Sequence, residues 1–368
     1  MSINLVFDGN YLFYKTLFVV GGYGKGSKVL EDKDEQDMFI RKIATDMSYA
    51  IRAFGKPDRV IFTIDSRSWR KDIIVEEADY KGHRVKDDTI DWDSFYKCMN
   101  EFAAHLERRG VIVSREERAE GDDLMYLWAD RLYSEGHDAI IITGDKDLTQ
   151  CVRWDGKNFV VVYNPNSKSR KIVAPQGFAT WLKKEDYDIF DASSYMNRSK
   201  DLIAEAANAI AVEEIDPKYV IFEKVICGDA GDNVPPIFTW LQKGKTFRIT
   251  PAKASRLYEV LNNNVFVDDV FDLPTRSTEI STSINGICKQ TSFPEGIKKR
   301  LEQNLQLVYL DKRIVPVDIQ DAFEKAFIRD VTKQPAFKDY NMTTILEGTR
   351  FLKDQSRTFE ADIFSKFK

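Results

Sequence analysis

The sequence Ile3-Asn4-Leu5-Val6-Phe7-Asp8-Gly9-Asn10 places an acid directly after a short apolar run. A run of this length is typical of a buried β-strand. We expect further strands of the same kind at Val60–Ile64, Val111–Ser114 and Ala139–Thr143. Amphipathic stretches lie between the strands and predict helices over Met38–Phe54, Trp92–Arg109 and Asp122–Ser134. Strand and helix alternating in this way predict an α/β fold, with a mostly parallel sheet flanked by helices on both faces.

The second half of the chain has a different pattern. Asn158–Tyr163 and Arg170–Ala174 flank a segment rich in turn-forming residues and predict a hairpin. Beyond residue 190 we expect mainly helices, over Lys200–Val212, Pro217–Cys227, Ala252–Asn262 and Pro294–Val308. The sequence therefore predicts an α/β domain over residues 1–190, a second, mainly helical domain over 191–333, and a loosely packed tail over 334–368.

Composition excludes several classes of protein. With 368 residues, 43% of them hydrophobic and 31% charged, the chain has the composition of an ordinary globular protein. No apolar run approaches the roughly 18–20 residues that a membrane span needs. Asp8, Asn10 and Lys15 interrupt the apolar stretch Ile3–Val20, so we do not expect a signal peptide. The four cysteines form no CxxC pair and there are three histidines, which argues against zinc and disulfides and favours a cytoplasmic location.

Acidic residues follow the predicted strands. Asp8 follows the first strand, Asp65 the second, and Asp145 and Asp147 the fourth. In a parallel sheet the carboxyl ends of the strands form the crevice where ligands bind. Two further groups complete the set of nine acids: Glu120, Asp122 and Asp123 at a helix start, and Asp229 and Asp232 in the turn Gly228–Asn233. Acids gathered in one crevice repel one another unless cations bind there.

Each acid alone has an ordinary structural explanation as a helix cap, a turn former or a residue favoured by the helix dipole. All nine serving such roles together is improbable. Oxygen ligands select a hard cation such as Mg²⁺ or Mn²⁺. Two such ions about 4 Å apart suit the hydrolysis of a phosphodiester.

Charge is segregated along the chain. The net charge is −5, and removing the nine acids leaves −5 + 9 = +4, so the remainder is mildly basic. The stretches Asn164–Lys184 and Trp240–Tyr258 carry several basic residues. These stretches favour a phosphate-bearing partner, although solvated faces remain an alternative.

Five motifs carry a resemblance to a known family. In order, they are Val6–Asn10, Ile64-Asp65, Glu120–Asp123, Thr143–Asp147 and Gly228–Asn233. They resemble the motifs of the flap endonuclease/5′-exonuclease superfamily, and most closely those of the RNase H of T-even-type bacteriophages. Further similar segments are Trp69–Asp72, Tyr80–Arg84, Asp91–Asp93 and Phe238–Leu257.

The resemblance implies a 5′-nuclease/PIN-like core that binds two Mg²⁺ ions, with Mn²⁺ as a substitute. It implies a first ion held by Asp8, Asp65, Glu120, Asp122 and Asp145. It implies a second, more weakly bound ion held by Asp123, Asp147, Asp229 and Asp232. Such enzymes remove RNA primers 5′ to 3′ during DNA replication and cleave 5′ flaps. The expected substrates are flapped, nicked or forked duplex DNA and RNA/DNA hybrid, and the expected products carry 5′-phosphates.

The long loop Ser66–Thr89 corresponds by resemblance to an arch above the active site, within a segment over residues 66–92. We expect Lys81 and Arg84 to be catalytic, gripping the scissile phosphate. Arg70, Lys71 and Tyr80 are candidate DNA contacts. Tyr80 would stack on a terminal base, or it is an ordinary packed aromatic.

Two further regions are candidate binding elements. The stretch after Asn233 resembles a helix–turn–helix that holds duplex backbone, with Lys243, Lys245, Arg248 and Lys253 as candidate contacts. The C-terminal aromatics Phe359, Phe364 and Phe367 predict either docking to a sliding clamp or single-strand-binding protein, or a helix packed on the parent domain.

Three alternative functions fit the sequence less well. A dehalogenase-type phosphatase needs a second acid two residues after its nucleophile, but position 10 is Asn. A PIN-type RNase would not explain Asp229, Asp232 and the helical domain. A DNA-structure-binding protein without catalysis is not favoured, because all nine acids are present.

Overall fold

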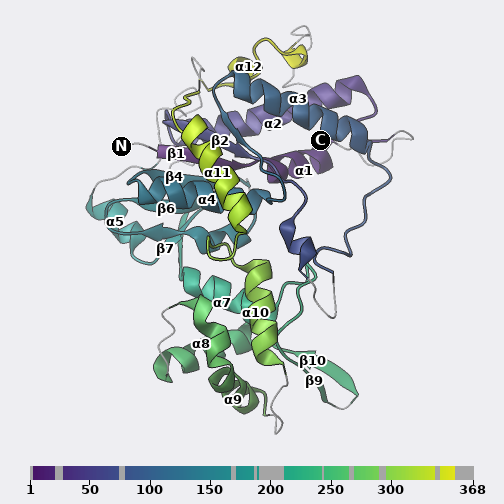
Figure 1. The fold of residues 1–368 in the computed structure, drawn as a ribbon. Coiled ribbons are helices and arrows are strands. Elements are labelled where there is room, and N and C mark those ends of the chain that lie inside the picture. Colours follow the sequence, from purple (N-terminus) through teal and green to yellow (C-terminus); the bar gives the residue numbers. More distant parts are fainter. Residues whose placement is uncertain are drawn as a thin grey trace.

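The computed structural model describes residues 3–20, 28–73, 79–166, 171–185, 189, 211–242, 244–264, 269–289, 296–335 and 340–352. An eight-stranded sheet runs in the order β3-β2-β1-β4-β6-β7-β8, with β5 paired to β6 (Figure 1). The strands are β1 (Ile3–Asp8), β2 (Arg59–Thr63), β3 (Ile112–Ser114), β4 (Asp138–Ile142), β5 (Arg153–Trp154), β6 (Phe159–Asn164), β7 (Lys171–Pro175) and β8 (Ala211–Ile215). Strands β3, β2, β1, β4 and β6 are parallel, and β7 is antiparallel to β6. The expected mostly parallel sheet is confirmed.

Alternate residues of a strand point to opposite faces of the sheet. Because the side chains on both faces are apolar, helices cover both. Leu5 and Phe7 of β1 pack beneath one layer of helices, whereas Val6 belongs to the cluster on the other face. The first layer contains α1 (Gly9–Val20), α2 (Lys33–Ala53), α3 (Trp92–Arg108), α5 (Phe178–Lys184) and α12 (Met342–Ile345). The second contains α4 (Gly121–Ser134) and α11 (Val317–Asp330). None of the helices in the described ranges combines the length and apolar composition needed to cross a bilayer.

A helical part with its own hydrophobic cluster lies below the sheet in Figure 1. It comprises α7 (Pro217–Cys227), α8 (Pro251–Asn264), α9 (Ser277–Cys288), α10 (Ile297–Val308) and a 3₁₀ helix over Val270–Arg276. A hairpin of β9 (Thr239–Gln242) and β10 (Lys245–Arg248) projects to one side. Gln150 joins the two parts: its Nε2 donates to the Val308 carbonyl at 3.1 Å, and its Oε1 accepts from the Leu310 amide at 2.9 Å.

The predicted elements of the first half lie where the sequence placed them, with bounds that differ by a few residues, and the predicted hairpin is the antiparallel pair β6–β7. The predicted helix Lys200–Val212 is wrong at its described end, where Ala211 and Val212 begin β8. These residues extend the sheet by pairing in parallel with β7, a long-range contact that helical periodicity cannot reveal.

The C-terminal segments return to the sheet. Phe323 and Phe327 of α11 pack on Trp128 of α4, although both lie within the predicted helical domain, residues 191–333. Ile345 and Phe351 are buried in the cluster around α2, although they belong to the predicted tail. The division of the chain into domains stays a prediction.

Candidate active site

A cavity of about 600 Å³ opens at the carboxyl ends of β1, β2 and β4. Its walls carry eight of the nine predicted acids: Asp8, Asp65, Glu120, Asp122, Asp145, Asp147, Asp229 and Asp232. Lys81, Arg84, Tyr11 and Tyr14 also line it. The fold therefore brings together carboxylates that are up to 224 positions apart (232 − 8) in the sequence.

Local hydrogen bonds orient the acids that follow the strands. Asp8 Oδ1 accepts from the Tyr11 amide at 2.8 Å, and its Oδ2 accepts from the Thr143 hydroxyl at 2.7 Å. Asp65 Oδ1 accepts from the Gly121 amide at 2.6 Å. A β-carbon at position 121 would lie 2.8 Å from Asp65 Oδ1, so glycine permits this close approach at the start of α4.

Asp8 is buried and Asp65 and Asp122 are half-buried in the same cavity, which disfavours their ionised forms. Burial raises the pKa of Asp8 to about 7, and Asp65 and Asp145 add to the shift. Burial also raises the pKa of Asp65 to about 6 and the pKa of Asp122 well above its ordinary value. A cavity whose carboxylates repel one another and offer only oxygen donors fits a hard divalent cation.

A second group of acids is more compact. One oxygen from each of Asp147, Asp229 and Asp232 lies within 4.8 Å of the others, and no other set of three His, Cys, Asp or Glu side chains in the described part of the chain meets this spacing. Asp147 begins a 3₁₀ helix, Asp147–Cys151, and the other two lie in the turn after α7. That turn starts at Gly228, where φ is +69° and a β-carbon would lie 2.3 Å from the Val234 carbonyl oxygen.

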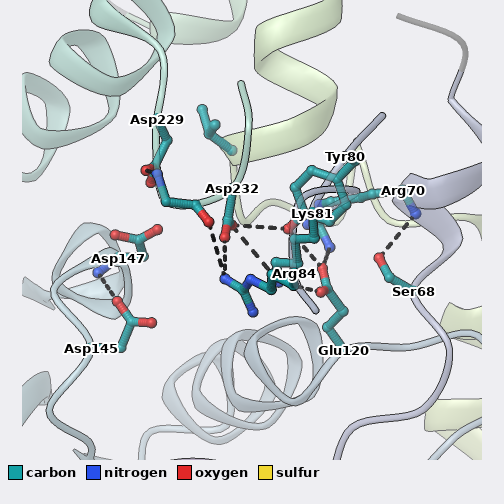
Figure 2. A network of polar contacts seen from close by, with 12 residues as sticks. Ser68, Arg70, Tyr80, Lys81, Arg84, Glu120, Asp145, Asp147, Asp229 and Asp232 are labelled. Atoms are coloured by element: carbon teal, nitrogen blue, oxygen red, sulfur yellow. Dashed lines mark hydrogen bonds and ion pairs between the residues drawn. The ribbon is translucent and has the colours of Figure 1, made fainter. Parts of the chain in front are cut away.

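The loop predicted to form the arch brings its cations to the cavity (Figure 2). Lys81 Nζ lies 2.5 Å from Glu120 Oε1 and 3.8 Å from Asp232 Oδ2. Arg84 Nη2 lies 2.5 Å from Asp232 Oδ1. Burial alone would raise the pKa of Glu120, but Lys81 and Arg70 outweigh it and hold that pKa at about 2. Glu120 is therefore ionised throughout the neutral range.

Arg70 and Tyr80 point into the protein. Arg70 is 2% exposed, and its Nη1 donates to Glu120 Oε2 at 2.9 Å. Tyr80 is 6% exposed, its hydroxyl lies 3.2 Å from Glu120 Oε2 and from Asp232 Oδ2, and its ring packs on Val234. This burial contradicts the prediction that Arg70 contacts DNA. Tyr80 follows its alternative interpretation as a packed aromatic, and both side chains hold Glu120 in place.

Asp123 does not join the other acids. It is fully buried, and its Oδ1 accepts from Arg70 Nη2 at 2.7 Å. Its Oδ2 accepts from Trp69 Nε1 at 3.0 Å and from the Glu120 amide at 3.2 Å. Both oxygens are therefore engaged away from the cavity, which contradicts the prediction that Asp123 binds the second metal. Its contacts instead fix the start of α4 against the arch segment.

The remaining candidate DNA contacts lie outside this cavity. Lys71 is exposed beside the buried Arg70, and Lys245 and Arg248 are exposed on β10. Lys253 on α8 places its ammonium 4.2 Å from the centre of the Trp240 ring. Lys243 lies outside the described residues. The expected helix–turn–helix is here a β-hairpin followed by α8.

Residues of the site that were missed in the sequence include Tyr11 and Tyr14 in the cavity wall, and Lys224 and Thr143 beside its acids. Lys224 contacts both Asp147 and Asp229, and Thr143 donates to Asp8. Lys224 lies five residues before Asp229 on a helix, where a lysine is usually a solvated charge. Its role depends on Asp147 of the 3₁₀ helix after β4, so no local pattern could have revealed it.

In metal-free protein, the free energy of unfolding should fall as the pH rises from about 5 to 8. The pKa values of Asp8, Asp65 and Asp147 are raised, to about 7, 6 and 6, chiefly by burial. Above their ordinary value of 3.8, the folded state therefore binds more protons than the unfolded state, and stability is lost as these groups ionise. The pKa of His105 is lowered by burial, so this one residue makes the folded state more stable as the pH rises. It opposes the trend set by the three acids and is outnumbered by them. Denaturant unfolding in EDTA checks it, and a rise over this range would contradict it.

Asp122→Asn should make this pH dependence shallower and stabilise the metal-free protein at pH 8, because it removes one buried charge from the cavity. The exposed Asp321→Asn on α11 serves as the control and should leave the slope unchanged. Equal slopes in all three proteins would show that Asp122 does not contribute to the pH dependence.

Asp123→Asn should destabilise the fold by about 3–5 kcal/mol, because it removes one of the two ionised carboxylates that pair with the buried Arg70 guanidinium and leaves Glu120 alone to balance it. Denaturant unfolding measures this loss, and calorimetric titration with Mg²⁺ of the folded variant should still show two binding phases. A variant of unchanged stability that had lost one metal phase would restore Asp123 to the ligand set.

Comparisons with known proteins agree with this architecture. Residues 4–182 match the family model of the 5′-3′ exonuclease, N-terminal resolvase-like domain. No curated protein sequence matches the chain. One similar solved structure is a bacteriophage T5 flap endonuclease in a pseudo-enzyme–product complex with DNA and metal ions. It has 16% identity and a TM-score of 0.50, and the alignment covers 90% of this chain and 100% of that chain.

A second similar structure is the bacteriophage T5 5′-exonuclease with bound divalent zinc ions. It has 15% identity and a TM-score of 0.51, and the alignment covers 89% of this chain and 99% of that chain. At these identities the two structures show a common fold. The family match covers residues 4–182, slightly less than half of the chain, and over most of its length the chain shares the fold of these two bacteriophage T5 nucleases.

Proposed function

We propose that this protein is a Mg²⁺-dependent 5′ nuclease that cleaves 5′ flaps and nicked or forked duplex DNA, and that removes RNA primers annealed to DNA during replication. The observation that carries the proposal is the cavity at the sheet edge, where eight carboxylates face two cations of the arch segment. Oxygen-only donors favour Mg²⁺ or Mn²⁺ over softer metals.

The acids of the cavity form two groups, and each group would hold one ion. Asp8, Asp65, Glu120, Asp122 and Asp145 would hold a first ion, and Asp147, Asp229 and Asp232 would hold a second. Two such ions supply the activation of water and the stabilisation of the leaving oxygen.

Lys81 and Arg84 line the same cavity and are within 4 Å of its acids, so they stand where a bound phosphate would place its charge. Both are held by carboxylates in the absence of substrate. The proposal assigns them to binding the scissile phosphate and stabilising the charge that develops on it.

Other parts of the proposal concern partners and remain predictions. Lys245, Arg248 and Lys253 would hold the duplex backbone without reading its sequence. Binding of a sliding clamp or single-strand-binding protein by the C-terminal aromatics falls on residues outside the described part of the chain. A cytoplasmic location, of the host if the chain is phage-encoded, and the particular likeness to T-even-type RNase H also stay predictions.

A labelled 5′-flap substrate should be cut in Mg²⁺ and left intact in EDTA, with 5′-phosphate products. Asp145→Asn should abolish cleavage yet retain most DNA binding, whereas Asp232→Asn should slow cleavage less. Lys81→Ala should lower kcat by about 10²–10³. The exposed Asp321→Asn should behave as wild type.

Gel analysis of the products, with binding measured in parallel by fluorescence anisotropy, checks these expectations. Cleavage by Asp145→Asn at the wild-type rate would refute the metal assignment. Cleavage of the flap but not of an RNA/DNA hybrid would refute primer removal and leave the proposed flap cleavage standing.

A further inference from the structure

Lys224 stands between two acids of the second group. It lies in the last turn of α7, and its ammonium contacts Asp147 Oδ1 and lies 2.5 Å from Asp229 Oδ2. Its side chain is 20% exposed. Asp147 follows a strand of the sheet whereas Asp229 follows α7, so one lysine links acids from the two parts of the protein.

Fixed cations account for the compactness of this group. Its three carboxylates have oxygens within 4.8 Å of one another and would repel at that spacing without positive charge among them. Lys224 neutralises part of the charge at Asp147 and Asp229, and Arg84 does so at Asp232. Lys81 lies 3.8 Å from Asp232 Oδ2 but pairs more closely with Glu120, so without it three negative charges against two positive ones leave the group at −1 (−3 + 2).

We propose that Lys224 is a resident counter-ion of the second acidic group, and that a divalent cation binds to this group only by displacing the lysine ammonium. A cation held by Asp147 Oδ1 and Asp229 Oδ2 needs the space that Lys224 Nζ occupies, because the ammonium contacts both of these oxygens. The inference rests on the proposed function, because it takes this group to be a metal site.

Two consequences follow for metal binding. Lys224 keeps the acids assembled in the metal-free protein, and it lowers their affinity for a divalent ion because the ion competes with a charge already in place. The two acidic groups therefore fill in order, the first at lower metal concentration than the second.

Calorimetric titration of the full chain with MgCl₂ and MnCl₂, without DNA, tests the proposal. Lys224→Met keeps the length of the side chain and removes its charge. We expect the weaker binding phase to tighten at least about tenfold, because the ion no longer displaces an attracted ammonium. The tighter phase should stay unchanged. In EDTA the variant should have a lower Tm than the wild type, and saturating Mg²⁺ should raise its Tm by more.

Matched variants separate charge from side-chain size. Lys224→Arg keeps the charge and should bind both ions as the wild type does. Lys218→Met removes an exposed lysine from the first turn of the same helix and should also leave both phases unchanged. If metal-free Lys224→Met is too unstable to titrate, Lys224→Gln replaces it, because glutamine keeps a hydrogen-bond donor without the charge. The expected result is the same.

A weaker phase that is unchanged or loosened in the Lys224→Met and Lys224→Gln variants would overturn the proposal, because the lysine would then only position the acids. A wild-type protein that binds no divalent ion in either phase would overturn the proposed function itself. The two failures are distinguishable, because the first leaves the tighter phase of the wild type intact.

Discussion

Repulsion among eight carboxylates in one cavity is the constraint on which the rest of the structure depends. The fold counters it by different means at different acids. Glu120 is paired with two cations, the buried Arg70 and the half-buried Lys81, and its pKa is low. Asp8 and Asp65 accept hydrogen bonds from backbone amides, and Asp8 also from a hydroxyl. Burial outweighs the effect of these hydrogen bonds, so both pKa values stay raised. The unbalanced charge is therefore concentrated at the ends of the central strands, where a divalent cation would be held most strongly.

Hydrogen bonds and an ion pair beside these acids connect the arch segment to the turn after α7. The Lys81 amide donates to the Asp232 carbonyl at 2.9 Å, and Asn233 Nδ2 donates to the Asp79 carbonyl at 2.9 Å. With Arg84 on the Asp232 carboxylate, these contacts place the arch cations between Asp232 and Glu120 (Figure 2). Lys81 and Arg84, which are proposed to bind phosphate, contact Asp232 directly. A change in charge at the second acidic group would therefore alter the position of these two side chains.

Sequence patterns predict the sheet and most of its acids for a physical reason. Short apolar runs become parallel strands, and parallel strands present their carboxyl ends at one edge, so acids that follow them must gather. The patterns fail where neighbours in sequence differ in surroundings. Asp122 and Asp123 are about 100° apart around α4, so one faces the cavity and the other faces inward. Which of them faces inward is decided by Trp69 and Arg70, which lie about fifty positions away. Lys224 was missed for the same reason, because it acts on an acid from another part of the fold.

Crystals grown with Mn²⁺ and measured at its absorption edge would test the central claim most directly, because anomalous scattering locates the ion itself. We predict two peaks within the cavity, one against Asp8, Asp122 and Asp145 and one against Asp147, Asp229 and Asp232, with the Lys224 ammonium moved away from Asp147. An empty cavity at millimolar Mn²⁺, or peaks confined to acids elsewhere on the surface, would contradict the claim that these carboxylates form a metal centre.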